Sequence, residues 1–269
     1  MIATGAPGAG QQRRIALGIE YDGTAYHGWQ MQPHAPSIQQ TLNGAIAAVA
    51  NEAIACVGAG RTDAGVHAAG QVVHFDTLAE RRPRSWLLGI NSRLPPDISV
   101  LWVEPVAPEF HARFSAQFRA YQYLLLNRPV RSALLRNRAW WVHAPLDVER
   151  MHAAAQALVG THDFSSFRAS ACQAHTPVRT LTNISMARSG DLIELVCRAD
   201  AFLHHMVRNL VGSLVRVGMG LEAPEWIASV LAKRDRRAAG PTAPAVGLTL
   251  MAAEYPAELL TMAALEASE

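Results

Sequence analysis

The sequence predicts an α+β fold, in which a largely antiparallel mixed sheet carries flanking helices. Two observations support this class. Several extended apolar segments follow one another directly or as a hairpin, which favours antiparallel pairing, whereas other segments repeat apolar residues at helical spacing. Half of the 269 residues are hydrophobic and 17% are charged, so the chain has enough apolar surface to bury a core.

The first part of the chain is predicted to alternate strands and helices. The segment RRIALGIEYDG (13–23) is extended, apolar and closed by a turn pair, so we expect a strand. Ser37 and Gln40 fit a capping box, and the apolar residues that follow repeat at helical spacing, so a helix should begin at Ser37. Two strands, a short helix and another strand are then expected at 52–60, 70–77, 85–95 and 98–106.

The second part begins with the aromatic strand segment SAQFRAYQYLLLNRP (115–129). Its alternation places Tyr121 and Tyr123 on one face and Gln122 on the other. A helix is expected to end at Gly160, because glycine is common just past a helix end. The remaining expected elements are that helix at 146–160, a hairpin at 182–202, helices at 204–218 and 223–235, and a last strand at 247–255.

The two parts have loosely similar layouts, although no sequence repeat of fixed period is present. We therefore expect an N-terminal subdomain at 13–114 and a C-terminal subdomain at 115–256. The Gly- and Ala-rich start, 1–12, is predicted to be a disordered tail, and 257–269 an exposed tail.

Composition excludes several classes of protein. No run of about 18 apolar residues predicts a membrane span, and the first residues lack the apolar core of a secretory signal, so we expect a cytoplasmic protein without membrane contact. Three cysteines lie far apart without a C-x-x-C spacing and are expected to be free thiols: Cys56, Cys172 and Cys197. No glycine-rich phosphate loop is present, so no nucleotide cofactor is expected.

The charge permits an RNA partner without indicating one. The formal net charge is only +2, which is weak for a nucleic-acid binder. Of 24 basic residues, only Lys233 is a lysine, and arginine is well suited to phosphates and to stacking on bases. Genome composition bias, given the equally heavy use of alanine, is the favoured explanation of the arginine excess. The candidate surface arginines are Arg13, Arg14, Arg81, Arg82, Arg84, Arg131, Arg136 and Arg138.

No metal site is expected, despite 11 histidines. His204 and His205 are adjacent, and on a helix they would point about 100° apart, so they could not both bind from one face. His67 and His74 are seven residues apart and have no evident third ligand.

The segment GRTDAGVH (60–67) allows two interpretations of Asp63. It can be a turn residue that accepts backbone N–H groups, with Gly65 supplying a positive φ. Alternatively, it is a carboxylate held for chemistry beside Arg61, as a nucleophile or a base. The residues alone leave both interpretations open.

Five segments in order resemble the tRNA pseudouridine synthase A family: YDGTAYHGWQMQP, GRTDAGVHAAGQVVHF, FHARFSAQFRAYQYLLLN, GTHDFSSFRA and ADAFLHHMVRNLVGSL. The resemblance covers nearly the whole chain. It implies a pseudouridine-synthase-like fold with two similar subdomains around a central cleft, the first carrying the catalytic motif. It also implies pseudouridine formation at positions 38, 39 and 40 of the tRNA anticodon stem-loop. A homodimer that binds tRNA across both subunits is implied as well, with no metal, cofactor or DNA.

The resemblance also implies roles for single residues. Asp63 corresponds to the catalytic aspartate, which attacks the sugar or base or removes a sugar proton. Arg61 corresponds to an arginine that replaces the target base or steadies its phosphate, and Arg208 to one that pairs with the aspartate. Tyr121 corresponds to a substrate-contacting tyrosine, and Leu250 to a leucine of the pocket wall.

Two other functions remain as alternatives. One is an RNA-binding module without catalysis, although such a module would have no need of a carboxylate near phosphates. The other is a nucleoside or glycoside hydrolase, which usually needs a second carboxylate. Asp22 and Asp76 are the plausible partners of Asp63 in that case.

Overall fold

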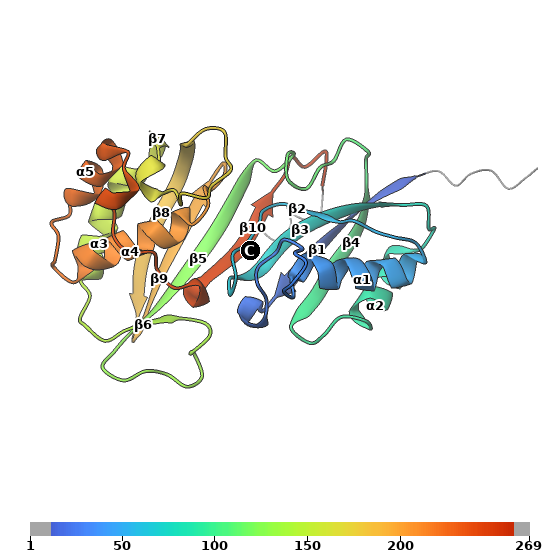
Figure 1. Cartoon of the computed structure of the whole chain (residues 1–269), viewed down its shortest axis with the longest axis horizontal. Helices are drawn as coiled ribbons and strands as arrows, with labels where there is room; N and C mark the ends of the chain where they lie inside the picture. The colour runs from blue at the N-terminus through green and yellow to red at the C-terminus, as the bar shows by residue number, and fades with distance from the viewer. Residues whose placement is uncertain (1–11, 261–269) are drawn as a thin grey trace, which may run out of the picture.

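The computed structural model describes residues 12–260 and contains helices and strands in mixed order (Figure 1). The helices are α1 (Ile38–Ala50), α2 (Pro83–Asn91), α3 (Val148–Ala155), α4 (Met206–Gly218) and α5 (Trp226–Lys233). The strands are β1 (Arg13–Tyr21), β2 (Val57–Gly58), β3 (His67–Thr77), β4 (Ile98–Val106), β5 (Phe118–Asn127), β6 (Trp140–Val142), β7 (Gly160–Asp163), β8 (Val178–Ser189), β9 (Leu192–Ala199) and β10 (Leu248–Glu254). No helix within this part of the chain is long and apolar enough to cross a membrane.

All the strands belong to one sheet in the order β4-β1-β3-β10-β5-β9-β8-β7, with β2 beside β3 and β6 beside β5. Pairing is antiparallel except between β10 and β3 and between β5 and β6. The predicted α+β class with a largely antiparallel mixed sheet is therefore confirmed. In Figure 1, β1 to β4 lie on the right with α1 and α2, and β7 to β9 lie on the left with α3 to α5.

Most predicted elements are present, and the start of α1 follows the capping rule. The Ser37 side chain accepts the backbone N–H of Gln40 at 3.3 Å. The helix expected at 146–160 is shorter, because the α-helix stops at Ala155 and a 3-10 turn follows. Gly160, with φ +112°, begins β7 instead of following a helix end directly. The short strands β6 and β7 were not predicted.

The last strand, β10, joins the two parts of the sheet. It pairs parallel to β3 and antiparallel to β5, so that Leu250 lies beside both Ala68 and Tyr121. β10 can come this close to β3 because residue 70 is a glycine. A Cβ at Gly70 would lie 2.1 Å from the carbonyl oxygen of Met251 in β10, which is too close for any other side chain. Because β3 directly follows the GRTDAGVH loop, this pairing places that loop next to β5.

The helices cover one face of the sheet and share a core with it. Each helix contributes a side chain with at most 1% of its surface exposed: Leu42, Trp86, Met151, Leu210 and Val230. A smaller apolar cluster covers the opposite face, built around Trp102, Phe110 and Tyr255.

Part of the expected C-terminal tail belongs to that smaller cluster. Leu260 is 1% exposed and packs there with the partly buried Leu259, so the prediction of an exposed tail is wrong for these two residues, whereas 257 and 258 are exposed. The backbone N–H groups of Leu259 and Leu260 donate to the carbonyl of Pro256, which folds the segment back. The other expected tail residues, 1–11 and 261–269, lie outside the described residues.

We expect His74 to make stability depend on pH. Its ring is 4% exposed and accepts the N–H of Ala112 at 3.1 Å, and burial, with His111 and Arg14 nearby, lowers its pKa to about 4 against the opposing effect of Asp76. The unfolded chain therefore binds one more proton between about pH 6.5 and 4, so stability is full above this window and falls as the pH decreases through it. For this group alone, the loss should be about 2 kcal/mol between pH 7 and 4.5.

The measurement compares urea unfolding of the wild type and of His74→Gln across this range. The glutamine oxygen can still accept the N–H of Ala112 but cannot titrate, so the variant should lose less stability on acidification. Equal pH slopes for the two proteins would contradict the prediction.

Candidate active site

Asp63 lies in the loop between β2 and β3, which several backbone contacts fix in place. The buried Gln71 side chain donates to the carbonyl of Gly60 at 2.7 Å and accepts its N–H at 3.3 Å. The carbonyl of Thr62 accepts the N–H of Trp29 at 3.0 Å. Gly65 has φ +77°, as the turn interpretation predicted. The loop thus meets the turn requirements, and the Asp63 side chain remains available for other contacts.

The Asp63 carboxylate forms an ion pair with Arg208 of α4. Arg208 Nη1 donates to Asp63 Oδ2 at 3.0 Å, and its Nε donates to the carbonyl of Ala243 at 2.8 Å. The side chains are 16% exposed for Arg208 and 22% for Asp63. The predicted pairing of these two residues is therefore present. Within residues 12–260, Arg208 makes the one hydrogen bond to this carboxylate, and Oδ1 accepts none.

His204 and His205 face the same carboxylate, although the sequence predicted that they would diverge. Their Nε2 atoms lie 3.4 Å from Asp63 Oδ1 and 3.3 Å from Oδ2, respectively, and their ring centroids are 4.0 Å apart. The prediction was wrong because both residues precede α4, and His205 adopts the left-handed conformation with φ +61°. Burial lowers the pKa of His205, an effect that the nearby Asp63 opposes.

Tyr121 lies on β5 close to the Asp63 loop. Its ring is 8% exposed and packs edge-on against Phe202 at 5.0 Å between centroids. A Cβ added to Gly60 would be 3.8 Å from the Tyr121 hydroxyl, so the hydroxyl end of the ring borders the loop. Burial raises the pKa of Tyr121. Leu250 is paired with Tyr121 across β10 and β5 and is completely buried, so it supports this strand from within the core.

Arg61 extends away from the loop on the exposed side. Its Nη1 donates to Gln173 Oε1 at 3.3 Å, in the segment between the 3-10 turn Ser165–Phe167 and β8. Arg61 and Arg208 therefore connect the same loop to two different segments of the second half of the chain.

The other carboxylates considered as partners of Asp63 have contacts elsewhere. Asp76 pairs with Arg14 at 2.7 Å, near the far end of β3. Asp22 caps a turn through the N–H of Thr24 and pairs with Arg138 at 2.9 Å. Neither contact involves Asp63, so the arrangement of two carboxylates that a hydrolase needs gains no support.

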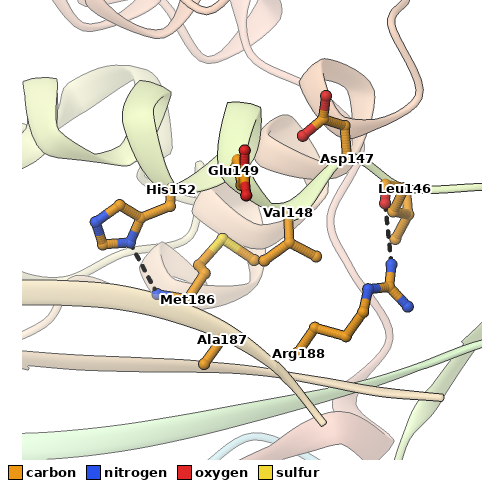
Figure 2. Close-up of a pocket in the computed structure, with 8 residues that line it drawn as sticks. All are labelled: Leu146, Asp147, Val148, Glu149, His152, Met186, Ala187 and Arg188. Carbon is orange, nitrogen blue, oxygen red and sulfur yellow. Dashed lines mark hydrogen bonds between the residues drawn. The ribbon is translucent and has the colours of Figure 1, made fainter. Parts of the chain in front are cut away.

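A surface depression between the start of α3 and β8 is separate from this cluster (Figure 2). Two of its polar side chains have protein partners, since His152 Nδ1 accepts the N–H of Met186 and Arg188 donates to the carbonyl of Leu146. None of the predicted site residues lines it. The depression is lined by Leu146, Asp147, Val148, Glu149, His152, Met186, Ala187 and Arg188.

Sequence reasoning gave no role to Gln71, and for His204 and His205 it left a cap, an RNA contact and packing open without placing the pair at Asp63. Gln71 lies within an otherwise apolar strand segment, and that polar residue was the available signal for a buried hydrogen-bonding role. For His204 and His205, the signal was their position at the predicted helix start, where helical spacing does not yet apply.

Comparison with known proteins gives consistent matches. The family model described as tRNA pseudouridine synthase matches residues 18–115 and 154–256. A protein of Aeromonas hydrophila named tRNA pseudouridine synthase A is 55% identical over 246 residues, which cover 91% of each chain. Proteins of the same name are 53% identical in Xanthomonas euvesicatoria, over 91% of this chain and 96% of the relative, and 52% identical in Hydrogenovibrio crunogenus, over 90% and 92%. The chain therefore belongs to the tRNA pseudouridine synthase family.

Proposed function

We propose that this protein isomerises uridine to pseudouridine at positions 38, 39 and 40 in the anticodon stem-loop of tRNA, as an intramolecular transferase. The observation that carries the proposal is the Asp63 carboxylate, which Arg208 fixes at one oxygen and to whose other oxygen no residue from 12 to 260 donates a hydrogen bond. Membership of the family supports the same reaction. A module that only bound RNA would gain nothing from holding a carboxylate in this way.

The reaction conserves atoms and needs no oxidant. The N1–C1′ bond of uridine breaks, the uracil turns, and a C5–C1′ bond forms. N1 gains a proton and C5 loses one, so the product is an isomer. In the proposed mechanism, Asp63 Oδ1 is the reactive oxygen, because Arg208 occupies Oδ2. It acts either as a nucleophile toward the sugar or base, or as a base toward a sugar proton. No metal or cofactor takes part in either route.

The target base must leave the helical stem before it can reach Asp63, which costs a few kcal/mol of unstacking. We propose that Arg61, exposed at the rim of the loop, takes the place of the base or holds its phosphate. Tyr121 supplies the aromatic surface next to Asp63, and Leu250 supports it from the adjacent strand. In this scheme, Arg61 would exchange its contact with Gln173 for one with RNA.

We also propose that residues 13–114 and 115–256 act as two subdomains that frame the cleft. The position of Asp63 in the first part and of Arg208 in the second supports this division. A homodimer that binds tRNA across both subunits would double the arginine surface of a chain with a net charge of only +2. Because tRNA is the substrate, we place the enzyme in the cytoplasm.

The loop between β5 and β6 is the best candidate for contact with the phosphates. It returns to the first half of the chain through the ion pair of Arg138 with Asp22. Arg131 and Arg136 are exposed in it, and neither forms an ion pair with a described carboxylate. Arg13 and Arg14, in contrast, pair with Glu80 and Asp76.

Asp63→Asn should abolish pseudouridine formation in unmodified tRNA transcripts, because the amide keeps the shape but loses the charge. We expect a loss of at least about 1000-fold, within the usual range for a positioned acid–base group or larger. Carbodiimide labelling maps the product. Asp191→Asn, at the exposed β8–β9 turn, is the matched control and should remain active. Activity in Asp63→Asn would refute the assignment of Asp63 as the catalytic residue. If the wild type produced no labelled pseudouridine, the proposed synthase activity would be refuted. Release of free uracil would indicate a hydrolase.

Arg208→Lys should lower kcat at least about tenfold and leave tRNA affinity nearly unchanged. Lysine keeps the charge but cannot hold Asp63 and the carbonyl of Ala243 together, as the guanidinium does. Arg216→Lys, two turns further along α4, is the control and should retain activity. Single-turnover kinetics and filter binding separate the two effects. An equal loss of kcat in both variants would indicate that the substitutions damage helix α4, and would contradict a specific role of Arg208 in holding Asp63.

tRNA binding should weaken steeply with salt, because each phosphate contact contributes a slope of roughly −0.7 to −0.9 in log K against log salt. The double variant of Arg131→Gln and Arg136→Gln should make this slope shallower by roughly one to two. Arg13→Gln removes an arginine that already faces Glu80 and should change the slope less. If tRNA binding by the wild type did not depend on salt, a surface that contacts the phosphates would be excluded. If the double variant kept the wild-type slope, the loop between β5 and β6 would be excluded as the site of phosphate contact.

A further inference from the structure

Three side chains with metal-binding atoms converge at Asp63. One ligand atom from each of Asp63, His204 and His205 lies within 4.8 Å of the ligand atoms of the other two residues. In the described part of the chain, the rings of His204 and His205 form no hydrogen bond. Their Nε2 atoms lie 3.4 and 3.3 Å, respectively, from the nearest oxygen of the Asp63 carboxylate. Two free imidazole nitrogens and one carboxylate form a donor set typical of zinc and related metals.

The separations between these atoms fit a metal better than they fit hydrogen bonds. Zinc binds nitrogen and oxygen at about 2.0 to 2.2 Å, so two ligand atoms at neighbouring corners of a tetrahedron lie about 3.4 Å apart. The distance from His204 Nε2 to Oδ1, 3.4 Å, has this value, and His205 Nε2 lies at a similar distance, 3.3 Å, from the other oxygen, Oδ2. We propose that Asp63, His204 and His205 form a binding site for a divalent transition metal of the zinc type, with water as the fourth ligand.

The surroundings favour such a site in one respect and weaken it in another. Arg208 holds Oδ2, which leaves Oδ1 to the metal, and a ligating carboxylate that is also hydrogen-bonded is a common arrangement. His204 already faces Oδ1, whereas the His205 ring, which lies nearest to Oδ2, has to turn toward Oδ1 to complete the site. The positive charge of Arg208, with Arg236 nearby, opposes a cation. The expected affinity is therefore micromolar, below that of structural zinc sites. Exposed fractions of 39% for His204 and 29% for His205 give a metal ion access.

The left-handed backbone at His205 is what makes the convergence possible. With φ +61°, the chain turns just before α4, so the two neighbouring rings point to the same side. Such a conformation is uncommon for histidine and marks positions where the surroundings hold a residue in place.

A metal at this site would occupy the oxygen that the proposed reaction uses. Zinc should therefore inhibit pseudouridine formation reversibly. This consequence rests on the proposed function, whereas the binding site itself does not, and the two are measured separately.

The test titrates the purified, chelator-treated protein with Zn²⁺ alone by calorimetry, and with Co²⁺ by visible absorption, which reports tetrahedral coordination. We expect one metal per chain. His204→Gln and His205→Asn should each weaken binding at least about tenfold, as the loss of a ligand should cost no less than the loss of a supporting contact. Asparagine tolerates the left-handed conformation at 205, so that variant should fold.

Two controls make the result specific. His143→Asn removes an exposed histidine elsewhere and should leave the affinity unchanged. Cys172→Ser removes the thiol whose Sγ accepts the N–H of His204 at 3.4 Å, and it should also bind normally. The proposed ligand set would be overturned if both histidine variants bound metal as tightly as the wild type. It would also be overturned if Cys172→Ser lost as much metal affinity as the histidine variants.

The activity arm adds Zn²⁺ to the pseudouridine assay. Inhibition should be half-maximal near the measured dissociation constant and should disappear when the metal is removed with a chelator. Full activity of the zinc-loaded protein would overturn the inhibitory role. A protein that binds zinc but forms no pseudouridine without it would refute the proposed function and leave the site in place.

Discussion

The ion pair between Asp63 and Arg208 is the contact on which the arrangement of the site depends. It joins residues 145 positions apart, so it depends on the tertiary arrangement that brings the two parts of the chain together. The pairing of β10 with both β3 and β5 brings the two parts of the chain together, and α4 then lies above the loop that carries Asp63. Both side chains are mostly shielded, which limits screening by salt and makes the loss of either partner more costly than at a surface.

Each partner of this pair is fixed by a second set of contacts. Gln71 holds the backbone of the Asp63 loop, and the carbonyl of Ala243 holds the Arg208 guanidinium. With both ends fixed, the carboxylate has one defined orientation, with Oδ2 toward the arginine and Oδ1 toward the space that His204 borders. A group oriented in advance in this way loses little freedom when a substrate arrives, which is how positioned catalytic groups lower a barrier.

Local rules of sequence explain most elements but few of the long-range contacts. The cap of α1 by Ser37, the alternation of β5 around Tyr121 and the turn at Gly65 follow from residue types a few positions apart. The two-residue strand β2 and the short strands β6 and β7 depend on neighbours that no local pattern identifies. The convergence of His204 and His205 was mispredicted because helical geometry was applied two residues too early, at 204 and 205, whereas α4 begins at Met206. The pairing of Asp63 with Arg208 was expected from the family resemblance and from the need of a half-buried arginine for an acid.

The distribution of charge also explains how a nearly neutral chain can present a basic surface. Many acidic groups are paired with arginines inside the molecule, as Asp76 is with Arg14 and Glu254 with Arg198. Each pair adds one positive and one negative charge and so cancels in the net charge of the chain. A net charge of +2 therefore says little about the charge of any one region of the surface. Arg131 and Arg136 have no such acidic partner among residues 12–260 and project from one loop. Local potential depends on charges within about 10 Å at ordinary salt. A phosphate near that loop would therefore meet unpaired arginine, whatever the net charge of the chain.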